Sequence, residues 1–377
     1  MAGIYLHIPF CHQACSYCDF HFSTNLKRVE DMAIAIEQEA VLRSGYLQGK
    51  PLFETIYFGG GTPSILPSAR LGSILDRLRE LFLVAENAEV SLEANPEDLS
   101  QAKLRELHAM GINRLSVGIQ SFSNADLKLL NRNHDAQQAD RCVKAAQDLG
   151  IENITIDLIY GIPGSGMKQW HENVSQAIGL QVPHVSAYAL TVEEKTLLHH
   201  QVSKGLLSPE PDSAHESQYF HLIDRLGEAG ILQYELSNFA RPGFRSRHNG
   251  AYWQGIPYLG LGPSAHSFDG ESRCWNAPNN AQYLRAIADG KSAIAQTETL
   301  TDRDQLNEYI MTHLRIVEGI DLGLMRERWG HDLLSLHEEE IEEWTAEGLV
   351  RIEDSHFRLT RHGFMVSDAI IRELFWV

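Results

Sequence analysis

Three cysteines lie within eight residues near the start of the chain, and this spacing constrains the segment more than any other feature. Cys11, Cys15 and Cys18 are separated by intervals of three and two residues, so one loop can bring all three thiolates to a single metal centre. A closed structural zinc site takes four nitrogen or sulfur ligands, and most electron-transfer iron–sulfur clusters take four cysteines. Three cysteines leave one corner of a cubane cluster open to a ligand that is not protein.

Two other assignments for these cysteines stay open. A zinc site would need a fourth ligand, which His7, His12 or His21 could supply. A disulfide is disfavoured because the chain shows no secretory signal and cytosolic thiols stay reduced. The remaining cysteines lie far away and singly. Cys142 falls in an apolar helical pattern and is expected to be buried, whereas nothing in the sequence accounts for Cys274.

Composition narrows the class of protein. The chain has 377 residues, of which 43% are hydrophobic and 22% charged, which is ordinary for a globular protein with a large core. No apolar run reaches the roughly 18 residues that a membrane-spanning helix needs. A strand pattern begins almost at the first residue, which leaves no room for a targeting peptide, so we expect a cytoplasmic protein. The net charge of −18 argues against a nucleic-acid partner, whose phosphates favour Lys and Arg.

The first half of the chain alternates strand and helix patterns. Six short runs have strand composition: 4–8, 55–58, 89–94, 114–120, 153–160 and 184–190. Between them lie segments with apolar residues at helical spacing: 31–46, 69–82, 99–110, 136–149 and 167–180. Such β/α units predict parallel strands with helical crossovers. Six units, fewer than the eight of a closed barrel, predict an open partial (β/α)6 barrel.

The pattern changes after the sixth unit, and we predict three segments. Residues 1–205 would form the partial barrel, and 206–280 an aromatic and glycine-rich extension. Residues 281–377 would form a C-terminal α+β domain, with an amphipathic helix over 333–344 and a hairpin that together resemble a winged helix. Winged helices often bind nucleic acid, but this one is acidic, so we interpret it as a packing or partner surface.

Polar residues fall where the predicted barrel strands end, which is where barrel chemistry is found. Glycines 59–61 follow the second strand, and Glu93, Gln120 and Asp157 alternate with apolar neighbours, so their side chains would face the barrel interior. A buried carboxylate is costly unless it is paired, and a bound ligand is the simplest partner. The alternative is that Glu93 and Asp157 pair with Arg114 or Arg132.

These features together resemble the radical S-adenosylmethionine (SAM) superfamily, in which three cysteines hold a 4Fe–4S cluster and SAM chelates the fourth iron. Five runs resemble the oxygen-independent coproporphyrinogen III oxidase group in particular: 4–11, 58–63, 93–96, 118–122 and 157–164. The resemblance implies that Cys11, Cys15 and Cys18 ligate the cluster and that Glu93 meets a positive group on SAM. It implies a SAM site made of Tyr5, Gly60, Gly61, Thr62, Glu93, Gln120, Arg132, Asp157 and Ala189.

Two departures separate the chain from the oxidases of that group, the HemN branch. Phe20 stands where those oxidases have a further cysteine, and only four residues precede Tyr5, where they carry an N-terminal extension. Both features match the HemW branch, regarded as haem chaperones. The run 248–253 also matches the His-Asn-x-x-Tyr-Trp motif of that branch, which implies haem binding by His248, Tyr252 and Trp253.

Other residues near that motif support or compete with this interpretation. Arg241, Arg245 and Arg247 could bind haem propionates, and His266 is a weaker candidate for a second iron ligand. In the competing interpretation His248 caps backbone groups in a loop, with aromatic side chains packed beneath it.

The resemblance thus implies a protein that binds haem and passes it to apo-proteins, such as respiratory haem proteins. It also implies possession of a 4Fe–4S cluster and SAM, formation of a homodimer and association with a membrane surface. We assign no catalytic residue, and cleavage of SAM is left open because the sequence names no electron donor. The alternative is an enzyme, an oxygen-independent coproporphyrinogen III oxidase that decarboxylates its substrate to protoporphyrinogen IX by radical SAM chemistry.

Overall fold

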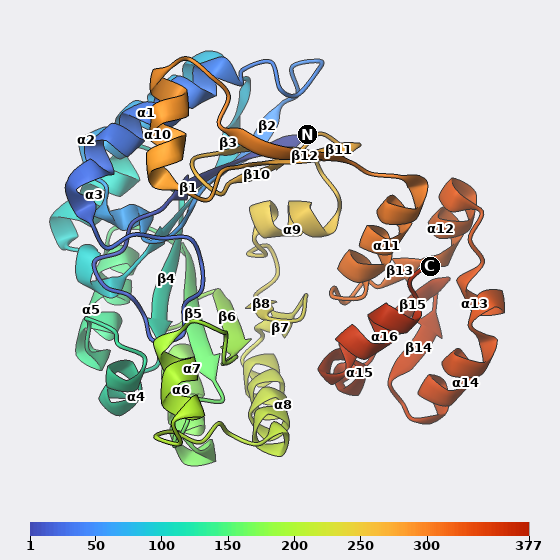
Figure 1. The fold of residues 1–377 in the computed structure, drawn as a ribbon. Helices are drawn as coiled ribbons and strands as arrows, with labels where there is room; N and C mark the ends of the chain where they lie inside the picture. Colours follow the sequence, from blue (N-terminus) through green and yellow to red (C-terminus); the bar gives the residue numbers. More distant parts are fainter. Residues whose placement is uncertain (377) are drawn as a thin grey trace.

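The computed structural model describes residues 1–376, and its centre is a twelve-stranded sheet (Figure 1). Six consecutive strands lie side by side and parallel, each joined to the next by a crossover. These strands are β1 (Ala2–Ile8), β2 (Phe53–Gly60), β3 (Val84–Ala94), β4 (Arg114–Gln120), β5 (Asn153–Tyr160) and β6 (His184–Ala189). The predicted α/β partial barrel is confirmed.

Helices cover the outer face of the parallel strands (Figure 1). The α-helices of this part are α1 (Val29–Leu42), α2 (Ser68–Leu81), α3 (Gln101–Ala109), α4 (Asn124–Leu129), α5 (Ala136–Asp148) and α6 (Met167–Gly179). Short 3-10 turns are η1 (Leu26–Arg28), η2 (Pro63–Ile65) and η3 (Pro96–Asp98). Side-chain caps set several helix starts: Ser100 accepts a hydrogen bond from the Lys103 amide, and Asp135 accepts one from the Gln138 amide.

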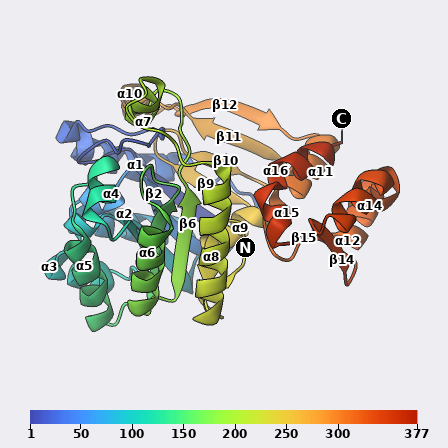
Figure 2. The same ribbon diagram turned by 90° about the horizontal axis from the view of Figure 1, so that it is seen from below.

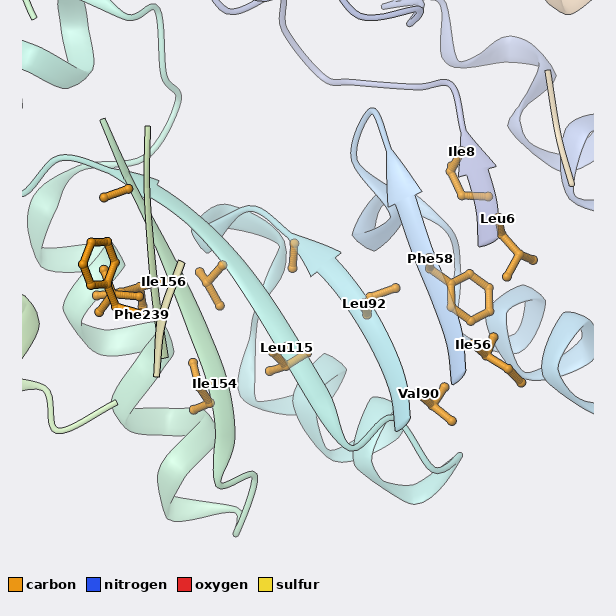
Figure 3. Close-up of a cluster of buried hydrophobic side chains, with 14 of the residues drawn as sticks. Leu6, Ile8, Ile56, Phe58, Val90, Leu92, Leu115, Ile154, Ile156 and Phe239 are labelled. Carbon is orange, nitrogen blue, oxygen red and sulfur yellow. The ribbon is translucent and has the colours of Figure 1, made fainter. Parts of the chain in front are cut away.

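Alternation along the strands separates core from lumen. The residues that point to the helices are almost fully buried, and Figure 3 shows them in a row across neighbouring strands. Leu6, Phe58 and Leu92 are each 0% exposed, and burial of such side chains stabilises the fold by roughly 1.5–3 kcal/mol each. The intervening residues, among them Tyr5 and Glu93, point to the opposite face. The apolar pattern therefore determines which polar side chains share the lumen.

Residues after the barrel extend the sheet at both edges. On one side β9 (Tyr258–Leu261) runs parallel to β1, followed by antiparallel β10 (His266–Phe268), β11 (Ser272–Asn276) and β12 (Ile294–Thr299). On the other side β8 (Asn238–Ala240) and β7 (Leu232–Gln233) continue antiparallel from β6. The helices here are α7 (Leu197–Ser203), α8 (Asp212–Glu228), α9 (Arg247–Trp253) and α10 (Asn280–Ala288). The predicted extension 206–280 therefore supplies strands to the barrel sheet, and β12 joins the same sheet from beyond residue 280.

The C-terminal unit has its own three-stranded antiparallel sheet, in the order β13-β15-β14. Its strands are β13 (Ile320–Asp321), β14 (Val350–Glu353) and β15 (His356–Leu359). Its helices are α11 (Asp302–His313), α12 (Leu322–Trp329), α13 (Leu333–Leu336), α14 (Glu338–Ala346), α15 (Arg361–Met365) and α16 (Ser367–Glu373). The predicted α+β character is confirmed, but the helix expected over 333–344 is two helices that meet at His337.

The C-terminal unit lies on the side of the sheet away from α1–α6, with α9 between them (Figures 1 and 2). The two units are joined by backbone hydrogen bonds, including one from the Leu236 amide to the Arg315 carbonyl at 2.9 Å. An ion pair between Arg245 and Glu318 at 2.6 Å adds to this contact. Among the described residues, none of the helices combines the length and apolarity needed to span a bilayer.

Candidate functional site

The cysteine loop follows β1 and receives hydrogen bonds from two other segments. Cys11, Cys15 and Cys18 are partly buried free thiols. Thr62 Oγ1 donates to Cys11 Sγ at 3.5 Å, and Arg132 Nη1 donates to Cys15 Sγ at 3.3 Å. Burial raises the pKa of Cys18 to about 11 and that of Cys11 in the same direction. Donors aimed at sulfur fit thiolates held in a cluster, whose charge they would offset.

The three thiols also differ in arrangement from a single-ion site. Within residues 1–376, no three His, Cys, Asp or Glu side chains converge closely enough to hold one metal ion. A cubane takes each of its three thiolates on a different iron, so its ligands need not converge on one point. The zinc alternative, with His7, His12 or His21 as fourth ligand, gains no support.

The end of β2 is shaped by glycines that no other residue could replace without strain. Gly60 has a φ of +108°, and a Cβ atom there would lie 2.7 Å from His7 Nδ1. A Cβ atom on Gly61 would lie 2.6 Å from the Phe10 carbonyl oxygen. The backbone at the end of β2 can therefore pack closely against His7 and the start of the cysteine loop.

Glu93 and Asp157 meet in the lumen, as their positions in the sequence predict. Glu93 accepts hydrogen bonds from the Tyr57 hydroxyl at 2.8 Å and the Gly60 amide at 3.2 Å. Burial, with the charge of Asp157, raises the pKa of Glu93 to about 7. Burial likewise raises the pKa of Asp157 to about 6, against hydrogen bonds from Ser186 and Ser116. Because both pKa values are raised, the charged form of each carboxyl group is costly, and a cation in the lumen would stabilise it.

Neither arginine considered as a partner of these acids forms an ion pair with them in residues 1–376. Arg114 instead lies 3.6 Å from a Glu89 oxygen. Arg132 donates to the Asn95 side chain at 2.5 Å and to the Gly118 carbonyl at 2.7 Å. Its Nε is buried without a hydrogen-bond partner in the described structure. Arg132 thus joins the cysteine loop to the end of β4 and keeps one donor unused.

The remaining predicted SAM residues lie at strand ends. Gln120 ends β4 with a φ of +69°, a strained conformation for a residue other than glycine, and such strain gathers at binding sites. A Cβ atom on Gly118 would lie 2.8 Å from the Gln120 side-chain nitrogen, so Gly118 makes room for that amide. Ala189 ends β6, is exposed, and pairs with Tyr160 of β5. Beneath them, a cavity of about 50 Å³ is lined by both lumen acids.

His248 lies inside the barrel, behind the aromatic side chains that the motif predicted to surround haem. It belongs to the first turn of α9, is 2% exposed, and stacks on Tyr57 with ring centroids 4.9 Å apart. Its Nδ1 lies 2.8 Å from Thr55 Oγ1 and its Nε2 lies 2.9 Å from the Tyr252 hydroxyl. Burial lowers the pKa of His248 to about 3, so the ring is neutral. In this structure neither ring nitrogen is free for a metal.

Tyr252 and Trp253, in contrast, line a cleft of about 630 Å³ between the two units. We call it the interdomain cleft. Its barrel wall includes Tyr5, His7, Phe20, Tyr252, Trp253, Tyr258, His266 and Phe268, and its C-terminal wall includes Glu308, Tyr309, His313, Arg328 and Trp329. The volume and the aromatic lining are those of a site for a flat organic molecule.

The arginines near the cleft are not those the sequence pointed to. Arg245 is paired with Glu318 and Arg247 with Glu54, and neither they nor Arg241 line the interdomain cleft. Arg273 and Arg328 do line it. Sequence reasoning missed both, because they approach the cleft from segments far from the motif and carry no local signal.

Comparisons with known proteins agree with this geometry. The radical SAM superfamily matches residues 5–177, and the family described as the HemN C-terminal domain matches residues 300–366. The chain is 32% identical to the protein named heme chaperone HemW of Bacillus subtilis (strain 168), over 98% of both chains. It is 35% identical to the heme chaperone HemW of Mycobacterium tuberculosis (strain ATCC 25618 / H37Rv), over 99% of this chain and 94% of the relative.

A solved structure shares the fold. The radical SAM enzyme coproporphyrinogen III oxidase (HemN) from Escherichia coli superposes with a TM-score of 0.85. The superposition covers 99% of this chain and 90% of the other, at 23% sequence identity. At this identity the likeness concerns the fold alone. Membership of a family is shown by the full-length sequence similarity to the two HemW proteins.

Proposed function

The chain belongs to the family of the heme chaperone HemW, and from this premise we propose that it binds haem and transfers it to apo-proteins. The observation that supports this most directly is the interdomain cleft. It is large enough for a flat macrocycle, it is walled by Tyr252 and Trp253 of the family motif, and Phe20 of the cysteine loop lies at its edge. A protein that carries haem between partners needs a site that is open to solvent, and this one lies between two units rather than within a core.

The cluster and SAM would occupy the barrel mouth, as membership of the radical SAM superfamily implies. We propose Cys11, Cys15 and Cys18 as the cluster ligands, with Thr62 and Arg132 donating to the sulfurs of Cys11 and Cys15. A reduced cluster of this kind can supply an electron to SAM. The hydrogen bonds from Thr62 and Arg132 would orient two of the sulfurs.

SAM would lie along the strand ends from β1 to β6. We propose that it is held by Tyr5, Gly60, Gly61, Thr62, Glu93, Gln120, Arg132, Asp157 and Ala189. Glu93 would meet a positive group, since a cation beside it lowers the cost of its buried charge. The Gly60 amide donates to Glu93 and the Gly61 amide to the Ile8 carbonyl, so these glycines would shape the backbone beside SAM and hold Glu93 in place. Gln120 and the unused Nε of Arg132 would supply further polar contacts.

Haem would lie in the interdomain cleft against Tyr252 and Trp253. The indole Nε1 of Trp253 is buried without a hydrogen-bond partner among the described residues, so it can donate to a polar group of the cargo. The predicted ligand role of His248 stays a prediction. Both of its ring nitrogens are engaged, so ligation through it would require loss of the hydrogen bond to Tyr252 or Thr55.

Haem transfer tests this function. Anaerobically reconstituted protein should bind haem in a spectroscopic titration and then lose it to an apo-protein such as a respiratory cytochrome, with the acceptor spectrum appearing as the donor spectrum fades. Failure to bind haem, or retention of it against excess acceptor, would contradict the proposal. The same preparation, given reductant, SAM and coproporphyrinogen III, should not form protoporphyrinogen IX over many turnovers; sustained product would favour the oxidase instead.

Location and assembly belong to the same proposal. Free thiols at the cysteine loop suit a reducing compartment, which supports a cytoplasmic site of action. Haem and haem-accepting apo-proteins are the proposed partners, and the acidic surface makes nucleic acid an unsuitable one. Dimer formation and association with a membrane surface stay predictions.

A further inference from the structure

The geometry points to His266 as the side chain that ligates haem iron in the interdomain cleft. This inference deepens the proposed function and rests on it. His266 is the first residue of β10 and lines the cleft together with Tyr252 and Trp253. It is exposed, and neither of its ring nitrogens takes part in a hydrogen bond among residues 1–376. A metal ligand needs such a free ring nitrogen.

The His266 ring nevertheless has one aromatic contact that restricts it. It stacks on Trp275 of β11, with centroids 5.4 Å apart and an angle of 20° between the rings. The backbone beneath it is equally restricted, since a Cβ atom on Gly260 would lie 1.9 Å from the His266 carbonyl oxygen. Glycine at this position lets β9 and β10 approach so closely. The stacking on Trp275 restricts rotation of the imidazole, which lowers the entropy lost on ligation.

Each of the other histidines of the cleft has at least one ring nitrogen in a hydrogen bond. His7 has both ring nitrogens within hydrogen-bond distance of partners, the Tyr5 hydroxyl at 3.2 Å and the His21 carbonyl at 3.0 Å. His21 has Nε2 2.8 Å from the Asn280 side chain. His313 has Nδ1 3.0 Å from the Tyr309 carbonyl. His21 and His313 each keep one ring nitrogen without a partner in the described residues, whereas His266 keeps both and is the exposed one of the four.

The surroundings of His266 suit a porphyrin. Tyr252, Tyr258 and Phe268 provide apolar faces on the barrel wall, and Trp329 provides one on the opposite wall. Arg328 lies over the Trp329 ring at 4.6 Å and has no carboxylate partner in the described residues. This contrasts with Arg273, which donates two hydrogen bonds of 2.8 Å to Glu308. The guanidinium group of Arg328 could therefore form an ion pair with a haem propionate.

Haem titration of cluster-reconstituted protein tests the assignment. His266→Ala should weaken haem binding by about tenfold or more and remove the resonance Raman and EPR signature of an iron–imidazole bond. Added free imidazole should restore that signature. His108→Ala, an exposed histidine on α3 outside the cleft, serves as the matched control and should bind haem like the wild type. Circular dichroism and cluster content confirm that each variant is folded.

The outcomes distinguish a failure of haem binding from a failure of the His266 assignment. If the wild type binds no haem, the proposed function fails and the inference with it. If the wild type binds haem but His266→Ala keeps the imidazole signature and the affinity, the inference alone fails. Loss of the signature in His248→Gln, with its retention in His266→Ala, would assign the iron to His248 and likewise overturn the inference.

Discussion

The imidazole Nε2 of His248 lies 2.9 Å from the hydroxyl oxygen of Tyr252. This bond joins the interior of the barrel to the wall of the interdomain cleft. On one side His248 stacks on Tyr57, whose hydroxyl donates to Glu93, and on the other Tyr252 faces the cleft. The family motif therefore unites two positions with different surroundings: a buried neutral ring and a partly buried phenol at the cleft wall.

Acid should destabilise the protein through His248. Burial lowers the pKa of His248 from 6.5 to about 3. Between pH 6.5 and pH 3 this histidine is therefore protonated in the unfolded chain and neutral in the folded chain. Stability from this group is complete above pH 6.5 and declines as the pH falls toward 3. Between pH 7.5 and 5 the loss should be about 2 kcal/mol. Urea unfolding of wild type and His248→Gln at both pH values measures it; equal pH dependence in the two would contradict the effect.

Loss of any cysteine of the loop should prevent assembly of the cluster. Alanine at Cys11, Cys15 or Cys18 removes one of the three protein ligands, and we expect the brown absorbance after anaerobic reconstitution to disappear. Cys142→Ala is the control, because that thiol is buried in α5 away from the loop. Iron and sulfide analysis provides the measurement. Full stoichiometry of both elements in a loop variant would refute the ligand assignment.

SAM binding should strengthen as the pH rises from 6 to 8. The pKa of Glu93 is raised to about 7, so its carboxylate becomes charged in this range and can then attract a cation. Glu93→Gln should bind SAM about tenfold more weakly at pH 8 and lose most of the pH dependence. Glu86→Gln, an exposed position on the same strand, should behave as the wild type. Calorimetry at three pH values decides, and identical affinities for Glu93→Gln and wild type would exclude this role.

Arg328 should contribute to haem affinity without affecting iron ligation. Arg328→Gln removes the cation proposed for a propionate, and we expect the dissociation constant to rise about three- to tenfold while the imidazole signature stays. Arg326→Gln, on the same helix and paired with Asp332 at 3.1 Å, is the matched control. The difference between the two variants should shrink in high salt. An unchanged Arg328→Gln titration would exclude the arginine from the site.

The barrel strands were the easiest part of the fold to predict. The ranges 114–120 and 153–160 coincide with β4 and β5. Parallel strands buried against helices carry dense apolar patterns bounded by turn residues, so local sequence is enough to locate them. The same alternation correctly predicted that Glu93 and Asp157 face the lumen together.

The later strands were not predictable in this way because their partners are distant in sequence. β9 pairs with β1, so Tyr258 lies beside Gly3, and no local pattern signals that pairing. Cys274 illustrates the consequence. The sequence offered no account of it, but in the structure it is 2% exposed and accepts a hydrogen bond from Arg43 Nη2 at 3.3 Å. Its role is to pack the end of α1 against β11.

The sequence alone predicts haem binding by His248 from its residue type and its motif, but its neighbours in the fold decide whether its ring nitrogens are available. An imidazole beside Tyr and Trp suggests haem, but the sequence cannot show that Thr55, which lies 193 residues earlier in the chain, is hydrogen-bonded to its Nδ1. Conversely, the sequence does not show that His266 lines the same cleft as Tyr252 and stacks on Trp275, because these contacts join separate elements of the fold.

The interdomain cleft takes its walls from both units: Trp253 stands on one and Trp329 on the other. Cargo seated there gains its contacts only while both walls are in place, so its binding free energy adds to that of the junction between them. By reciprocity, a displacement of the C-terminal unit away from the barrel would lower the affinity of the cleft for a bound molecule. Such a displacement would also break the contacts that join the units, among them the hydrogen bond from Leu236 to Arg315 and the ion pair between Arg245 and Glu318.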